Sequence, residues 1–405
     1  MKYLKEKSNA AERLNWYIIC ESVLCGIIVL SIILDQNAFT SFLLILSFVV
    51  ILMHFGKLLL HGFTRIMIFC IYLMIISLVM VCISTLKFEA VFSFNYLKEY
   101  IIFASAIVYL CIASEEKINR RTTGFLLKSD LIVGCIYPIA YFTLPDPSTT
   151  VGLQMNFTNT NLTGMWILQS VLLAFICFPV LKGGWRFLAA ATGIFNIYLV
   201  YLTNARNAYV AFALFLVLYL WNLLKKKPRY SKAFVAVLVL LPLIFVPLYF
   251  WLIYPISEKG WLDFLVSEGK PLSSRMKIWS RVVDRLNMKN SWVSGNYPYL
   301  HGNMHNLYMV VLGSYGSLTL GGVIAYLIYI TVEVNKKSDG AFNRLCLATF
   351  FAGLFLGIGE GAFFSGGVGL NLAITSFLLM ANGDACEPML GCRKHEPKKS
   401  KYILK

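Results

Sequence analysis

Long apolar stretches, each flanked by a few polar residues, repeat along almost the whole chain. A helix needs about 17 to 25 predominantly apolar residues to cross a bilayer, and runs of that length predict about twelve spans. They centre near residues 26, 46, 75, 104, 134, 172, 194, 215, 243, 318, 351 and 374. The first run, from Tyr17 to Leu34, is too long for a signal peptide and lacks a small-residue cleavage site. The pattern therefore predicts an all-α polytopic membrane protein with a single domain over residues 1–405.

The distribution of Lys and Arg orients these spans. The chain is 58% hydrophobic and only 14% charged, against about 25% charged residues in soluble domains. With the N-terminus in the cytoplasm, 26 of the 36 basic residues fall in inner segments, where cytoplasmic loops keep them. Both termini are therefore expected in the cytoplasm. The net charge of +16 follows from this topology and favours contact with anionic membrane lipids, and it does not indicate a nucleic-acid partner.

One predicted outer loop is much longer than most others. Residues 255–304, between spans 9 and 10, contain three tryptophans, seven basic residues and four acidic ones. Within this extracytoplasmic loop, Ser274 to Leu286 has the period of an amphipathic helix, with Arg275 on its apolar arc and Arg281 on its polar edge. An anionic ligand at the outer leaflet explains the basic excess. A helix lying on lipid headgroups, with Arg275 snorkelling to water, explains it as well.

Three residues on the predicted outer side have side chains suited to chemistry on a phosphate. Arg206 opens the eighth span, Arg275 begins the amphipathic stretch, and His305 opens the tenth span. Arginine is permanently charged and its planar fork matches phosphate oxygens. Histidine accepts a proton from a hydroxyl near neutral pH. Each residue also has a structural explanation, since Arg206 could anchor a span at the headgroups and His305 could cap a helix.

The remaining ionisable residues are weaker candidates. Glu360, in a Gly-Ile-Gly-Glu-Gly sequence, is a carboxylate at membrane depth that could pair with an arginine or bind sugar. Glu21, in the first span, is explained by snorkelling or pairing. His54 lies on the predicted inner side, and His301 lies in a Gly-rich turn.

The sequence does not indicate a metal site or a cofactor. No Asp-x-Asp motif occurs in an outer loop, and no His, Cys, Asp and Glu cluster has metal-ligand spacing. Cys386, Cys392 and His395 in the predicted inner tail are too few ligands for a good case. We therefore expect metal-independent chemistry.

Four motifs in the second half of the chain occur in an order that is similar to a known family. Arg206 lies in Thr203-Asn204-Ala205-Arg206-Asn207-Ala208 before an apolar span, Ser274-Arg275 precedes Trp279, Gly295-Asn296 follows, and His305-Asn306-Leu307-Tyr308 leads into Leu312-Gly313-Ser314-Tyr315-Gly316. This order resembles the O-antigen ligase and O-antigen polymerase (Wzy-type) superfamily of bacterial envelopes. The resemblance covers roughly residues 200 to 320, and the first half matches only in hydrophobicity and span count. The family usually has Ser-Arg-Gly where this chain has Ala205-Arg206-Asn207.

The resemblance implies an inverting, metal-independent glycosyltransferase of the membrane-embedded GT-C-like class. Its donor would be a glycan linked to undecaprenyl diphosphate. Arg206 and Arg275 would hold the diphosphate, and His305 would act as general base on the acceptor hydroxyl. Asn306 and Tyr308 would position the sugar or His305.

We therefore expect a polymerase of surface-polysaccharide repeat units, such as O-antigen, capsule or exopolysaccharide. It would lie in the bacterial cytoplasmic (inner) membrane with its active site facing outward. Chain-length regulators and a flippase are the protein partners that this role implies. An O-antigen ligase that moves the glycan to an acceptor would use the same residues, and a polysaccharide transporter or flippase would share the span count.

Overall fold

The computed structural model describes residues 14–91, 93–149, 152–157, 159–224, 229–253, 255, 273–300, 304–338, 340–358, 362–365 and 367–383. In chain order, the helices are α2 (Trp16–Ile33), α3 (Asn37–Leu60), α4 (Arg65–Lys87), α5 (Phe94–Glu115), α6 (Arg120–Thr143), α7 (Thr160–Val180), α8 (Gly184–Leu202), α9 (Arg206–Leu224), α10 (Lys232–Leu248), α12 (Ser273–Asn287), α13 (Leu307–Lys337), α14 (Ala341–Phe355), α15 (Ala362–Ser365) and α16 (Val368–Asn382). Three short helical turns, η1 (Tyr249–Ile253), η3 (Met288–Asn290) and η4 (Leu356–Ile358), complete the helical elements. Two-residue strands β1 (Ser148–Thr149) and β2 (Gly152–Leu153) pair antiparallel.

Polar side chains fix where several helices begin. Asn119, Asn159 and Ser231 each accept a hydrogen bond from a backbone N–H in the first turn of α6, α7 and α10. Such caps satisfy N–H groups that have no partner within the helix. The apolar runs therefore become separate helices whose boundaries are set by the polar residues between them.

Eleven helices in the described part of the chain are long and apolar enough to cross a membrane. Every predicted span centre falls inside a helix, and the all-α polytopic architecture is confirmed. The twelfth apolar segment, α16, has 15 residues and is shorter than a typical span. It begins at Val368, directly after Gly367, whose φ of 104° is incompatible with a continuing right-handed helix.

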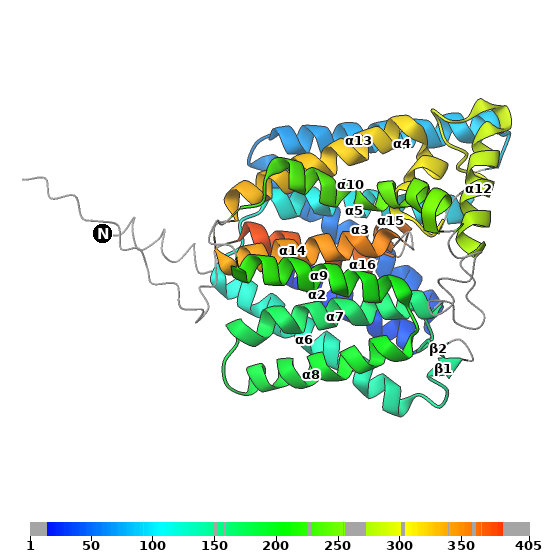
Figure 1. Ribbon diagram of the computed structural model, residues 1–405. Coiled ribbons are helices and arrows are strands. Elements are labelled where there is room, and N and C mark those ends of the chain that lie inside the picture. The colour runs from blue at the N-terminus through cyan, green and yellow to red at the C-terminus, as the bar shows by residue number, and fades with distance from the viewer. Residues whose placement is uncertain are drawn as a thin grey trace, which may run out of the picture.

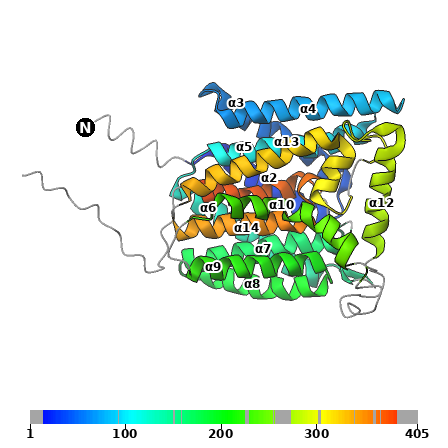
Figure 2. The ribbon, with the colours of Figure 1, turned by 45° about the horizontal axis from the view of Figure 1, so that its top comes forward.

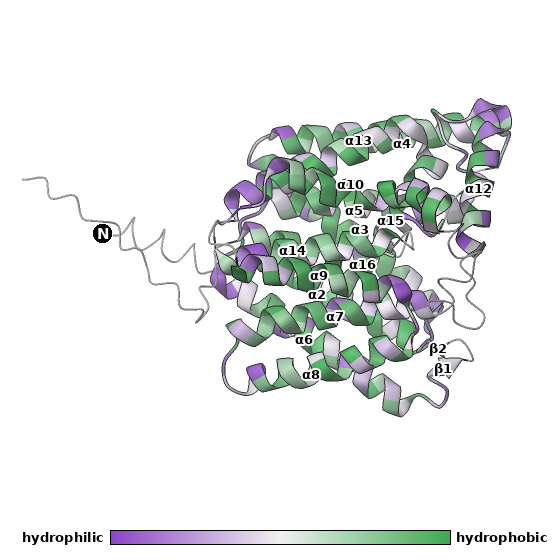
Figure 3. Cartoon of the chain, viewed as in Figure 1, coloured by the Kyte–Doolittle hydropathy of each residue, from purple (hydrophilic) through white to green (hydrophobic). Residues whose placement is uncertain are grey.

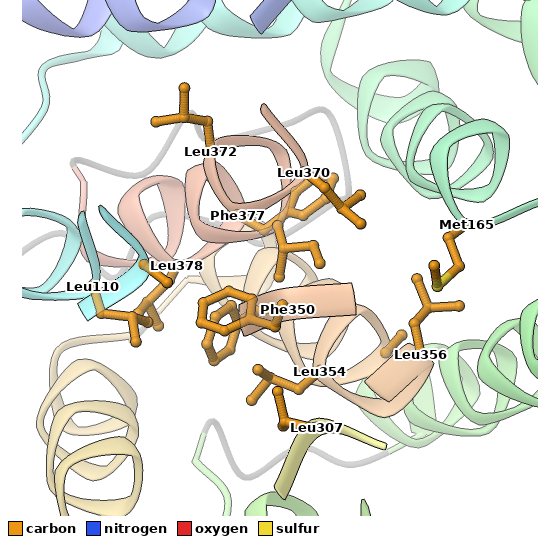
Figure 4. Packing of buried hydrophobic residues seen from close by; sticks show 14 of the residues in the cluster. Leu110, Met165, Leu307, Phe350, Leu354, Leu356, Leu370, Leu372, Phe377 and Leu378 are labelled. Atoms are coloured by element: carbon orange, nitrogen blue, oxygen red, sulfur yellow. The ribbon is translucent and has the colours of Figure 1, made fainter. Parts of the chain in front are cut away.

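The helices form a bundle with α14 and α16 at its middle, and α5 and α7 pack against them (Figure 1). Phe350 of α14 lies among buried leucines, including Leu354 of the same helix, Leu110 of α5 and Leu378 of α16 (Figure 4). Helices nearer the outside expose large apolar side chains instead, such as Phe42 of α3. A surface of this kind is stable against lipid acyl chains, because apolar side chains there meet no water.

The two ends of the bundle are polar and its middle is apolar (Figure 3). Helix α12 lies across the helix ends at one side of the bundle, and the β1–β2 pair lies at that same end (Figures 1 and 2). We call this the α12 end. The last turns of α3 and α13, with Lys57, Lys336 and Lys337, lie at the opposite end. The positive-inside trend predicts that this opposite end is cytoplasmic.

The segment that follows α12 packs into a break in α13. Gly316, inside α13, has φ 82° and ψ 175°, so the helix is interrupted there. The backbone carbonyl oxygen of Trp292 accepts a hydrogen bond from the N–H of Ser317 (2.8 Å). The carbonyl oxygen of Gly313 accepts one from the N–H of Asn296 (2.7 Å). A Cβ on Gly316 would collide with the carbonyl oxygen of Val293. The break in α13 therefore holds the returning loop against the start of that helix.

Candidate functional site

The amphipathic helix predicted from the loop sequence is present as α12. Trp279, Val282 and Leu286 are buried on one face, while Lys277 is exposed. Val283, predicted on the apolar arc, is 37% exposed because it lies at the arc's edge, about 40° beyond Trp279 at 100° per residue. Of loop residues 255–304, positions 256–272 and 301–303 lie outside the described part of the chain.

Trp279 joins α12 to the rest of the α12 end. Its ring is fully buried and lies 5.2 Å from the ring of Tyr249 and 6.0 Å from that of Phe250, both in η1. Its indole Nε1 donates a hydrogen bond to the carbonyl oxygen of Met304, 3.0 Å away. A single side chain therefore contacts the end of the ninth span and the residue immediately before His305.

Arg206 and Arg275 come together at this end of the bundle. Arg206 is the first residue of α9 and follows a turn in which Asn204 has φ 51°. Arg275 lies one helical turn before Trp279, on the same face of α12, and both arginines are partly buried. The charges of the two guanidinium groups act on each other, and both act on the buried hydroxyl of Tyr249. Two partly desolvated guanidinium groups within electrostatic reach of each other favour an anion between them.

His305 lies in a constrained turn beside this framework. Its φ of 53° is in the left-handed region, which costs a residue with a Cβ of order 1–3 kcal/mol. Asn306 holds that turn from the other side. Its Oδ1 accepts from the N–H of Tyr308 (3.0 Å), and its Nδ2 donates to the carbonyl oxygens of Pro242 (2.9 Å) and Ile358 (3.2 Å). The backbone at His305 is therefore fixed to α10 and to η4.

The same η4 turn reaches the helix that begins with Arg206. It packs against α9 as well as against α10 and α13. Arg206 is thus connected to the His305 turn by packing through η4, and Arg275 is connected to it through Trp279 and Met304. Elements far apart in sequence meet here at one end of the bundle.

The other predicted site residues have different surroundings. Asn306 and Tyr308 are fully buried, and the Tyr308 hydroxyl donates to the carbonyl oxygen of Val239, 2.6 Å away. This geometry favours the expected role in positioning His305 over direct contact with sugar. Arg281 is exposed on the polar edge of α12. Glu360 lies outside the described residues.

Tyr249 is a member of the site that the sequence did not indicate. In the sequence it is one aromatic residue among several at the end of an apolar run, a common pattern at a membrane interface. Its proximity to both arginines depends on the π-helical turn η1 and on the packing of Trp279.

Other expectations concern residues and groups elsewhere. His301, His395, Cys386 and Cys392 lie outside the described residues. In the described part of the chain, no three His, Cys, Asp or Glu side chains come together as metal ligands would.

No protein-family model, curated protein or solved structure matches the chain.

Proposed function

We propose that this protein is a membrane glycosyltransferase that polymerises oligosaccharide repeat units linked to undecaprenyl diphosphate, at the α12 end of the bundle. The observation that carries this proposal is that Arg206 and Arg275, from different elements, lie within electrostatic reach of each other and of the Tyr249 hydroxyl. A diphosphate has several anionic oxygens, and two arginine forks can bind them in a bidentate manner. The resemblance of the motifs to O-antigen polymerases supplies the substrate class.

The proposed step uses His305 as general base. His305 takes the proton from the acceptor hydroxyl, whose oxygen forms a bond to the anomeric carbon of the donor glycan. The bond between that carbon and the diphosphate oxygen breaks, and undecaprenyl diphosphate leaves with the negative charge. Arg206 and Arg275 stabilise that departing charge, an interaction that grows stronger as the bond breaks.

An O-antigen ligase is the nearest alternative, because its leaving group is the same. The two enzymes differ only in the acceptor, which is a lipid-linked repeat unit for a polymerase and a different surface molecule for a ligase. The same three residues serve either reaction.

A polysaccharide transporter is favoured by a different observation. Glu21 and His54 are buried within the bundle, and α13 is interrupted at Gly316. Buried ionisable groups and broken helices are common features of secondary transporters.

Glycan ladders from cells that lack their own copy test these three functions together. The cells would express the wild type, Arg206→Ala, Arg275→Ala, His305→Ala or Lys277→Ala at matched membrane abundance. Lys277 is the control, because it is exposed on the same helix as Arg275. A polymerase leaves only single repeat units when the gene is deleted or when Arg206, Arg275 or His305 is replaced, and the control keeps long chains.

Two other results would change the assignment. Long chains that stay on undecaprenyl diphosphate identify a ligase. A deletion that removes surface glycan, combined with substitutions that change nothing, overturns the catalytic roles and favours the transporter.

A further inference from the structure

A cavity that includes two carboxyl groups in its largely apolar lining lies within the bundle. It has a volume of about 50 Å³ and is bounded by α2, α5, α6, α7 and α16, five helices that contact one another in the lower and middle part of Figure 1. Its lining includes the carboxyl groups of Glu21 and Asp130, and no Lys or Arg is among the described residues that line it. A space of this size, with carboxyl and amide groups in its lining, can hold several water molecules, since each needs roughly 10–15 Å³ by the same kind of measure.

Four polar atoms of this lining have no hydrogen-bond partner among the described residues. Gln169 is 5% exposed, yet neither its Oε1 nor its Nε2 has a hydrogen-bond partner within the described part of the chain. The same holds for the indole Nε1 of Trp166 and for the Oε2 of Glu21. Buried polar atoms are almost always satisfied, and water in the cavity would supply partners to these atoms.

His54 connects this cavity to the end of the bundle opposite α12. Its Nδ1 lies 2.9 Å from Oε1 of Glu21, and its Nε2 lies 3.8 Å from Oε2 of Glu116. Glu21 and His54 are 1% and 0% exposed, whereas the Glu116 side chain is 15% exposed and reaches solvent. Asn15 donates to the other oxygen of Glu116 (2.5 Å) and so fixes its orientation.

Few charged groups surround Glu116, His54 and Glu21, and the negative ones outnumber the positive ones. Tyr17 stacks on His54, with ring centroids 5.1 Å apart, and Lys57 lies over the outer face of Tyr17. Ser22 donates to Asp130 (2.9 Å). On the cavity side the lining also includes Tyr109, Tyr137 and Cys25, and the Cys177 thiol of α7 lies within electrostatic reach of Asp130. Three carboxyl groups therefore face one imidazole and one more distant ammonium.

We propose that Glu116, His54 and Glu21 transfer protons between solvent at the end opposite α12 and the cavity, where Glu21 and Asp130 form a proton-binding site. Ionisable side chains that form a chain inside a membrane protein are a common means of moving protons. The transferred species is a proton, because the imidazole of His54 lies between two carboxylates. Its Nδ1 faces Glu21 and its Nε2 faces Glu116.

The transfer balances in two steps. Glu116 takes a proton from solvent and gives it to Nε2 of His54, across 3.8 Å that a small side-chain rotation closes. The proton on Nδ1 then passes to Oε1 of Glu21. Glu116 is ionised again, and His54 is neutral with its remaining proton on Nε2. A flip of the imidazole ring turns this protonated nitrogen toward Glu21 before the next transfer, while the proton on Glu21 passes on to the cavity and Asp130.

Infrared difference spectroscopy of the full-length protein in lipid nanodiscs tests the site. A pH titration of the wild type is expected to show a protonated carboxyl band that disappears as pH rises. Glu21→Gln or Asp130→Asn should remove or shift that band. Glu333→Gln, at a partly exposed carboxylate of α13 paired with Lys336, is the matched control and should leave the band unchanged.

Deuterium exchange of that band tests the route through His54. His54→Phe keeps an aromatic ring against Tyr17 but removes both nitrogens. In this variant the carboxyl proton that gives the band should exchange with deuterium about tenfold more slowly or slower still, since a positioned acid–base group accelerates proton transfer by such factors.

Two results would overturn the proposal: a wild-type spectrum with no titrating carboxyl band, and equal exchange rates in wild type and His54→Phe. Either would leave Glu21 and His54 as a structural ion pair. Because the wild-type spectrum alone can give the first result, poor folding of a variant does not leave the proposal undecided. The glycan-ladder experiment is independent, since it replaces none of these residues.

Discussion

The indole of Trp279 donates to the carbonyl oxygen of Met304 across 3.0 Å, and this bond links the helix that carries Arg275 to the turn that carries His305. Both groups are buried. In such surroundings an N–H left without its acceptor costs about 1–3 kcal/mol. The bond therefore restricts how far α12 and the start of α13 can move relative to each other.

Trp279→Phe tests this link, because it keeps a large ring against Tyr249 but removes the N–H. We expect a loss of about 1 kcal/mol in stability, the usual net value of one hydrogen bond. Under the proposed function we also expect a lower kcat with little change in KM, since His305 would be less well positioned. The measurements are the thermal unfolding midpoint in detergent and the transfer rate.

Trp292→Phe is the matched control for that experiment. Its indole donates to Asn287 across 2.9 Å at a partly exposed position, away from Met304. Equal effects on transfer rate from both substitutions would show that the Met304 bond has no particular role in the site.

The arginine pair predicts non-additive losses on substitution. Arg206→Ala and Arg275→Ala should each weaken binding of undecaprenyl diphosphate by about tenfold or more, since charge-assisted hydrogen bonds are worth about 1.5–3 kcal/mol. The double variant should lose less than the sum, because the two side chains share one ligand. Arg→Lys at either position should recover only part of the affinity, because the fork geometry is lost.

Calorimetric titration of the four proteins with undecaprenyl diphosphate provides the measurement. Exposed Lys277, replaced by Ala, should leave the affinity unchanged. Strictly additive losses would mean that the two arginines bind separate groups.

The sequence predicts the helices well because each apolar run satisfies its own backbone within a membrane. Every span centre, and the amphipathic helix from Ser274 to Leu286, corresponds to a helix in the structure. Helix α16 is shorter than its apolar run indicates, because hydropathy does not report the positive φ of Gly367.

Side-chain partners are harder to predict because they depend on packing between helices. Arg206 and Arg275 were expected to meet, but Tyr249 joins them through η1. Snorkelling or pairing is the sequence explanation of Glu21; the side chain is 1% exposed and pairs with His54 of the next helix, so it does not snorkel. Its partner depends on helix packing, but an ionisable residue within a span is by itself a signal of function.

Gly316→Ala should destabilise the protein through the break in α13. Its φ of 82° is unfavourable for alanine, and the added Cβ would collide with the carbonyl oxygen of Val293. Strain of this kind costs of order 1–3 kcal/mol. Gly321→Ala is the control on the same helix, because a Cβ there meets nothing within 4 Å. Thermal unfolding of both variants measures the difference, and equal midpoints would mean that the break adapts to a side chain.

Glu116 predicts how stability depends on pH at the end opposite α12. Partial burial raises the pKa of its carboxyl, but the imidazole of His54, 3.8 Å away, with help from Lys57 and Asn15, outweighs burial and holds the pKa below its usual range. A carboxyl whose folded pKa is lowered adds stability above its unfolded pKa, about 4.3 for glutamate, and loses it as pH falls through the folded value. Glu116→Gln should therefore be less stable than wild type at neutral pH, and the difference should shrink below about pH 4. Unfolding midpoints measured across this range test the sign, and a gap that widens in acid would show that His54 does not stabilise the ionised form.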